Sequence, residues 1–173
     1  MNEAPPLSWR EALPSDARSL SHLGRATYLA TAAVDHPGEA LLDFLDDAHG
    51  VDLYRSWLED PAYLFLIGLT PLGAPAGYAM VAPHPTVSHG DAELKRIYLL
   101  PPWQGTGDAD RLMISLLRLA RSRQIEQLFL SVFETNARAR RFYEKHGFEL
   151  IGDTDSWLVP GRKLSLYRRT IDA

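Results

Sequence analysis

The chain has 173 residues, a formal net charge of −4 and no cysteine, which excludes disulfides, thiolate nucleophiles and cysteine zinc sites. At this length we expect a single domain with a real core, and the acidic balance disfavours a general nucleic-acid binder. The start, "MNEAPPLSWR", lacks the basic and apolar segments of a signal peptide, and no apolar run is long enough for a membrane span. These features predict a cytoplasmic protein that binds neither nucleic acid nor membrane.

The N-terminal third is predicted to be helical after one short strand at 7–13. A helix over 14–32 begins at a cap-like Ser-Asp pair and carries apolar residues at helical spacing. The helical pattern resumes over 36–59 and breaks near Gly50. No repeat or low-complexity linker separates this part from the rest of the chain.

The remainder predicts a mixed sheet with helices on its faces. Apolar runs of strand length alternate with amphipathic stretches, and 83–91 reads as a loop. The predicted strands are 62–69, 76–82, 92–100, 126–133, 148–152 and 163–170, and the predicted helices are 107–122 and 137–146.

The stretch "LPPWQGTGDADRLM", from Leu100 to Met113, places two glycines between a strand and a helix. Such a turn gathers free backbone N–H groups and the positive end of a helix dipole, which together favour a phosphate. A Walker loop would need Gly-Lys-Ser/Thr, and the dinucleotide fingerprint fails at Asp110. For a lone glycine pair, an ordinary tight turn is the more common explanation.

The pair is part of a longer signature. "QGTGDA" fits Q/R-x-x-G-x-G/A, and "NARARRFYEKHGF" follows about thirty residues later. From Glu93 to Gly152 the chain resembles the GCN5-related N-acetyltransferase (GNAT) superfamily, and most closely its bacterial polyamine and small-amine acetyltransferases. The resemblance implies an α/β (α+β) fold over 1–173, a single N-acetyltransferase domain. Its sheet would be mixed, mostly antiparallel and six- to seven-stranded, with helices on both faces and a splayed central strand pair.

The resemblance also implies acetyl-CoA as the acetyl donor. The strand end at 97–99 would pair with the pantetheine arm, and one of its N–H groups would polarise the thioester carbonyl. The turn at 104–109 would hold the pyrophosphate, and Asn136 would contact the pantetheine or simply cap a helix. The implied cofactor-binding residues are Ile97, Tyr98, Leu99, Gln104, Gly105, Thr106, Gly107, Asp108, Ala109, Asp110, Asn136 and Tyr143.

Two catalytic residues follow from the same likeness. Tyr143 matches the family tyrosine near the thioester sulfur, where a phenol can protonate the leaving thiolate; its alternative is a core aromatic. Glu93 lies eleven residues before Gln104, where the histone-acetylating branch carries its base. Other candidates for the base are Glu134, His84, His89 and a water. No metal site is expected, because the six histidines are scattered.

Two aspartates depart from the family pattern. Asp108 and Asp110 stand where apolar, small or basic residues are usual, and their charge would compete with a phosphate. We therefore expect weakened cofactor binding, unless arginines compensate. The candidates for that role are Arg111, Arg138 and Arg141.

The most favoured reading is an acyltransferase that acetylates a small primary amine or polyamine by direct transfer in a ternary complex, because without cysteine a thioester acyl-enzyme is excluded. A degenerate CoA-binding sensor, and a protein N-terminal or lysine acetyltransferase, stay open, as does a homodimer. An acidic wall would suit a cationic acceptor, although a solvated helix face explains the same residues. The acids of 35–60 are Asp35, Glu39, Asp43, Asp46, Asp47, Asp52, Glu59 and Asp60.

Overall fold

The structure is a computed structural model that describes residues 4–34, 36–83, 91–156 and 159–171. The chain folds into two compact units: unit 1 comprises 1–80 and 96–116, and unit 2 comprises 81–95 and 117–173. Strands β3 (Pro75–Pro83) and β4 (Asp91–Leu99) and helix α4 (Asp108–Ser122) contribute to both.

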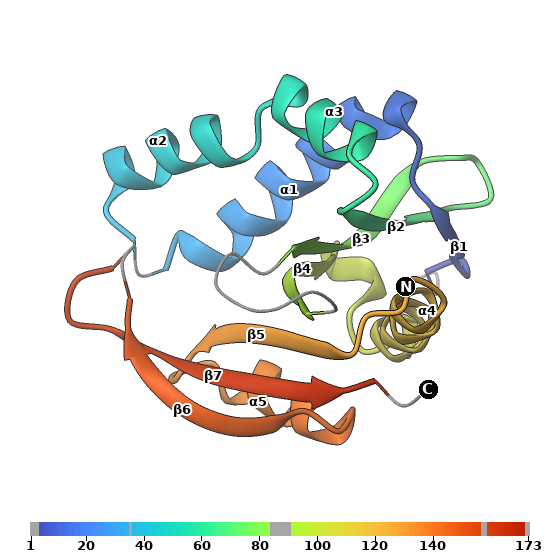
Figure 1. Ribbon diagram of the computed structural model, residues 1–173. Coiled ribbons are helices and arrows are strands. Elements are labelled where there is room, and N and C mark those ends of the chain that lie inside the picture. The colour runs from blue at the N-terminus through green and yellow to red at the C-terminus, as the bar shows by residue number, and fades with distance from the viewer. Residues whose placement is uncertain (1–3, 35, 84–90, 157–158, 172–173) are drawn as a thin grey trace. The chain divides into compact units, whose positions relative to one another are not determined.

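Unit 1 places three helices over the first strands of the sheet (Figure 1). The helices are α1 (Ala17–Ala32), α2 (Gly38–Ala48) and α3 (Val51–Glu59), and short 3₁₀ turns lie at Pro14–Asp16 and Pro101–Trp103. Strand β1 (Ser8–Glu11) pairs antiparallel with β2 (Leu64–Leu69). Five of the six residues of β2 are buried, as expected for a strand that contributes to a core.

Unit 2 contains the C-terminal strands and helix α5 (Ala137–Lys145). Strand β5 (Gln127–Phe133) pairs in parallel with the start of β4 and antiparallel with β7 (Lys163–Thr170), which also pairs antiparallel with β6 (Glu149–Asp155). The side chains of α5 contact the buried Tyr167 of β7.

The pairings join into one seven-stranded sheet in the order β1-β2-β3-β4-β5-β7-β6. This mixed, mostly antiparallel sheet with helices confirms the predicted fold class. The break near Gly50 is also confirmed, because α2 ends at Ala48 and α3 starts at Val51. The parallel pairing of β4 with β5 covers Asp91–Glu93; the splay of the central strands and the two-faced helix layer stay predictions.

Two expectations about local structure were wrong. The Ser-Asp pair does not cap α1: the carboxylate of Asp16 accepts a hydrogen bond from Leu13 N at 2.7 Å and pairs with Arg10. The predicted loop at 83–91 overlaps both strands, because Pro83 ends β3 and Asp91 begins β4, and 84–90 lie outside the described residues.

A buried polar chain crosses the core of unit 1. His49 Nδ1 lies 2.9 Å from the hydroxyl of Tyr54, which lies 2.9 Å from the hydroxyl of Tyr78. All three side chains are fully buried, and His49 Nε2 has no hydrogen-bond partner among the described residues. A Cβ at Gly24 would lie 2.1 Å from His49 Nδ1, so the imidazole requires a glycine on α1.

Protonation of His49 is expected to destabilise the protein at low pH. Burial, with help from Arg96 and Arg25, lowers the pKa of His49 from 6.5 to about 3. Between these values the unfolded chain binds a proton that the folded chain does not, so this contribution is complete above pH 6.5 and declines towards pH 3. By pH 4.5 the loss is about 2–3 kcal/mol.

Urea unfolding at pH 7 and about pH 4.5 measures that loss. The natural protein should lose about 2–3 kcal/mol more than His49→Gln, which has no titrating imidazole. Equal losses in the two proteins would show that the imidazole is as easily protonated in the fold as outside it.

Candidate active site

The glycine turn of unit 1 has the backbone that a close ligand requires. Gly105 and Gly107 have φ values of +85° and +87°, in the left-handed region that favours glycine. A Cβ at Gly105 would meet no atom within 4 Å, and one at Gly107 would meet only Arg111 Nη2 at 3.8 Å. The surface over both glycines is therefore open to a ligand, directly before the first turn of α4, whose N–H groups lack intrahelical partners.

Side chains of the turn fix its shape. Gln104 Nε2 donates to the carbonyl of Leu99 at 3.0 Å, which ties the turn to the end of β4. The single hydroxyl proton of Thr106 is shared between two acceptors, the carbonyl of Trp103 at 2.8 Å and Oδ2 of Asp108 at 2.7 Å. Gln104, predicted to contact the pyrophosphate, thus orients the loop in this structure.

Asp108 is built into the turn rather than exposed on it. Its side chain is 2% exposed, and its Oδ2 accepts a hydrogen bond from Thr106 Oγ1 at 2.7 Å. Arg111 Nε lies 3.6 Å from Asp108 Oδ1, and Arg111 Nη2 donates to the carbonyl of Thr106. The carboxylate therefore supports the loop and has a cation beside it, which reduces the repulsion that it would exert on a phosphate.

The end of β4 lies next to the turn within unit 1. Leu100 N donates to the carbonyl of Ala76 at 2.9 Å, so the strand remains attached to β3 at this point. Leu99 is buried, and Ile97 and Tyr98 are partly buried. The carbonyl of Leu99 uses one of its two acceptor positions on Gln104.

Arg96, just before this strand end, was not identified from the sequence. Its Nη2 donates to the carbonyl of Ala48 at 2.9 Å, and its guanidinium carbon lies 5.4 Å from the ring centroid of Tyr54 and 5.0 Å from that of Trp57. Residues two apart in a strand share a face, so its position between Leu94 and Tyr98 was the available signal for an inward-facing cation.

Helix α5 carries the remaining predicted cofactor residues, in unit 2. Asn136 caps the helix, since its Oδ1 accepts from Ala139 N at 3.0 Å; a contact with pantetheine stays a prediction. The partly buried Tyr143 packs its ring 5.9 Å from Phe148 and 6.4 Å from Tyr167, centroid to centroid. The ring of Tyr143 is thus held by packing whatever its hydroxyl does.

The candidate bases differ in their surroundings. Glu93 is partly exposed and its Oε2 lies 2.7 Å from Lys95 Nζ, so the carboxylate is ion-paired. Glu134 is exposed. His84 and His89 lie outside the described residues. Among the residues that the structure describes, no three histidine, aspartate or glutamate side chains gather as metal ligands would.

The acidic residues of α2 and α3 are partly neutralised. Asp46 Oδ1 lies 2.7 Å from Arg25 Nη1, and Asp52 Oδ1 lies 2.5 Å from Arg55 Nη1, with both carboxylates exposed. Asp35 lies outside the described residues. Exposed ion pairs of this kind are typical of a solvated helix surface and leave less negative charge to bind a cationic acceptor.

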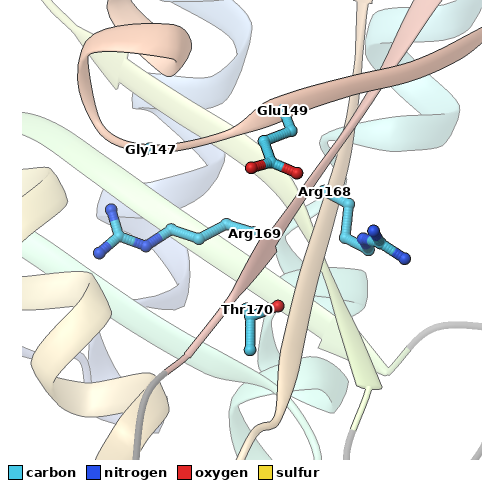
Figure 2. A pocket seen from close by; sticks show the side chains of 5 residues that line it. All are labelled: Gly147, Glu149, Arg168, Arg169 and Thr170. Carbon is cyan, nitrogen blue, oxygen red and sulfur yellow. The ribbon is translucent and has the colours of Figure 1, made fainter.

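A cavity of about 220 Å³ in unit 2 contains none of the predicted site residues (Figure 2). It is lined by Gly147, Glu149, Arg168, Arg169 and Thr170. The two arginine side chains diverge along β7 in Figure 2, and Arg169 donates to the carbonyl of His146 at the end of α5. The two guanidinium groups therefore do not converge on one anion.

Comparison with known proteins assigns the chain to a family. The family model described as the acetyltransferase (GNAT) family matches residues 23–148. The chain belongs to this family. An uncharacterised N-acetyltransferase of Mycobacterium tuberculosis is 31% identical over 138 residues, covering 80% of this chain and 86% of the relative. The family assignment confirms that the chain is an acyltransferase.

One further curated relative and one solved structure are also similar to the chain. A spermine/spermidine N(1)-acetyltransferase of Bacillus subtilis is 30% identical over 94 residues, covering 51% of this chain and 62% of the relative. The solved structure of yncA from Salmonella typhimurium, described as an acetyltransferase with its cofactor acetyl-CoA, superposes with a TM-score of 0.77 at 20% identity. That alignment covers 96% of this chain and 95% of the other, and it shows a shared fold.

Proposed function

We propose that residues 1–173 act as one N-acetyltransferase domain that moves the acetyl group of acetyl-CoA directly to a small primary amine. The observation that carries the proposal is the turn at 104–109, where two left-handed glycines leave the backbone open before the first turn of α4. Such an arrangement suits a pyrophosphate. Family membership and the acetyl-CoA bound to the Salmonella structure support the same donor.

We assign the following roles in cofactor binding to residues of the chain. The turn holds the pyrophosphate, and a backbone N–H between Ile97 and Leu99 polarises the thioester carbonyl. Asn136 helps to orient the pantetheine while it caps α5. The arginine beside Asp108 offsets part of that residue's charge, because Arg111 Nε lies 3.6 Å from the carboxylate.

Proton transfer completes the reaction. The amine loses a proton to a base and attacks the thioester carbon; the C–S bond breaks, and the thiolate of CoA takes a proton from Tyr143. Glu93 is the proposed base, directly or through a water, with its carboxylate held by Lys95 at 2.7 Å. Glu134, His84, His89 and water remain its alternatives.

The acceptor is proposed at the level of a small primary amine, with polyamines as one candidate group. The likeness to the Bacillus subtilis spermine/spermidine acetyltransferase supports polyamines, whereas the ion-paired Asp46 and Asp52 weaken the case for an acidic wall. Within the described residues, no helix is both long and apolar enough to cross a membrane. The cytoplasmic location and the homodimer stay predictions.

Thiol release from acetyl-CoA, measured across small amines, amino acids, polyamines and peptides with free N-termini, tests the proposal. Acetylation of a small amine is expected. Binding of acetyl-CoA without turnover on any acceptor would instead favour a CoA-binding sensor, and turnover only on peptides would favour a protein acetyltransferase.

A further inference from the structure

Arg96 in unit 1 is a partly buried cation that forms no ion pair within the described part of the chain. Its guanidinium donates to the carbonyl of Ala48 at 2.9 Å and to the sulfur of Met80 at 3.3 Å, and it lies over the rings of Tyr54 and Trp57. Among the described residues, no carboxylate forms an ion pair with it. Unpaired charges are costly to bury, so this arrangement calls for an explanation.

The titratable groups around Arg96 do not supply the missing charge. Burial raises the pKa values of Tyr54, Tyr78 and Tyr98, so their phenols are neutral near pH 7. Burial, followed by the charge of Arg96, lowers the pKa of His49 to about 3, so that imidazole is neutral too. The guanidinium charge therefore faces uncharged groups on β3, α3 and β4 itself.

Arg96 also has donors left for a ligand. A guanidinium has five N–H groups in a fork that fits a carboxylate in a two-point contact. The carbonyl of Ala48 and the sulfur of Met80 occupy one position on each terminal nitrogen, and the hydroxyl of Tyr54 is a further hydrogen-bond partner of the guanidinium. The contact with Ala48 and the aromatic rings holds the fork in place, which lowers the entropic cost of binding an anion.

The position of Arg96 along β4 connects it to the reacting groups. It immediately precedes Ile97, and Tyr98 follows on the same face of the strand. The rise is about 3.3 Å per residue, so the backbone of Arg96 is a few ångströms along the strand from the backbone proposed to polarise the thioester carbonyl, and the guanidinium lies at the far end of the Arg96 side chain. One small molecule with both an amine and a carboxylate can contact groups spaced in this way.

We propose that Arg96 binds a carboxylate of the acceptor, so that the acceptor is a small primary amine that also carries a carboxylate, such as an amino acid. The inference rests on the proposed function and narrows its acceptor. It distinguishes this chain from an enzyme whose acceptors are polyamines, because a polyamine would bring a second cation towards Arg96 and be repelled.

Matched pairs of amines test the inference in the natural enzyme. Alanine and ethylamine, phenylalanine and 2-phenylethylamine, and lysine and 1,5-diaminopentane differ within each pair by the carboxylate. Thiol release from acetyl-CoA should give a higher kcat/KM for the carboxylate-bearing member, by about ten-fold or more. A preference for the decarboxylated members or for peptides would overturn the inference while leaving acetyltransfer established.

Arg96→Gln tests whether this residue provides the preference. The kcat/KM ratio within a pair should fall by about ten-fold, mainly through a higher KM for the carboxylate-bearing amine, since the lost contact exists before and during the reaction. Arg96→Lys should fall in between, because an ammonium keeps the charge but lacks the fork. Arg18→Gln, which changes an exposed arginine on α1, should leave the ratio unchanged.

The ratio also separates recognition from a structural role. Arg96 holds the end of α2 through Ala48, so Arg96→Gln can reduce the folded fraction, but that loss affects both members of a pair equally and cancels. An unchanged ratio in Arg96→Gln would overturn the inference. Failure of every amine to release thiol would overturn the proposed function and the inference together.

Discussion

Gly107→Val is expected to weaken acetyl-CoA binding at least about 100-fold, as measured by titration calorimetry. Gly107 has a φ of +87°, and a β-branched residue is a genuine outlier there. Valine would force the backbone out of this conformation or place a branched side chain over the open surface of the turn. Either change removes N–H groups from the proposed pyrophosphate contact, where several charge-assisted hydrogen bonds act together.

Gly73→Val is the matched control. Gly73 lies in the turn between β2 and β3, has a φ of +79°, and a Cβ there would also meet no atom within 4 Å. This variant bears comparable backbone strain, about 1–2 kcal/mol, at a place without a proposed ligand. Loss of affinity in both variants, or in neither, would remove the turn at 104–109 from the cofactor site.

A substitution beside the turn is expected to have the opposite effect and to strengthen acetyl-CoA binding. Asp110 lies in the first turn of α4, where a carboxylate competes with a phosphate for the helix dipole. Asp110→Ser should therefore lower the acetyl-CoA dissociation constant by several-fold. Weaker binding by this variant would mean that the carboxylate has a constructive role in the site.

The elements were predictable because their signals are local. Leu94 and Tyr98 share one face of their strand, and Leu112, Met113 and Leu116 share one face of their helix. All of these residues except Tyr98 are buried. The turn was predictable for a related reason: Gly105 and Gly107 occupy left-handed conformations that other residues avoid. The glycines of the motif therefore mark the positions where the backbone is left-handed.

Side-chain pairing was not predictable in the same way. Asp108 reads as an exposed acid in a helix's first turn, yet it is 2% exposed because Thr106 and Arg111 contact it. The contact of Arg96 with Ala48, 48 residues away, depends on how α2 lies within unit 1. Such a long-range contact has no sequence periodicity, so residue type alone did not suggest the unpaired cation. The pair of Asp108 with Arg111 is local, and the sequence offered Arg111 as a candidate partner.

Tyr143→Phe should lower the turnover number by about 100-fold or more, which is the usual range for losing a general acid. The phenylalanine ring keeps the packing of Tyr143 against Phe148 and Tyr167, so the fold should persist. Acetyl-CoA affinity should change little, since the proton is transferred only as the C–S bond breaks. Steady-state kinetics gives the turnover number, and calorimetry gives the affinity.

Tyr167→Phe, in the same unit, separates a chemical role from a structural one. The Tyr167 hydroxyl donates to Glu144 Oε1 at 2.8 Å and accepts from Arg140 Nε at 3.1 Å. Its removal should cost about 1–3 kcal/mol of stability, because a buried polar contact is left incomplete, with turnover per folded molecule preserved. The opposite pattern is expected for Tyr143→Phe: an unchanged melting temperature with slow turnover. If Tyr143→Phe instead melts earlier and turns over normally, then the thiolate takes its proton from water and Tyr143 is a packing residue of α5.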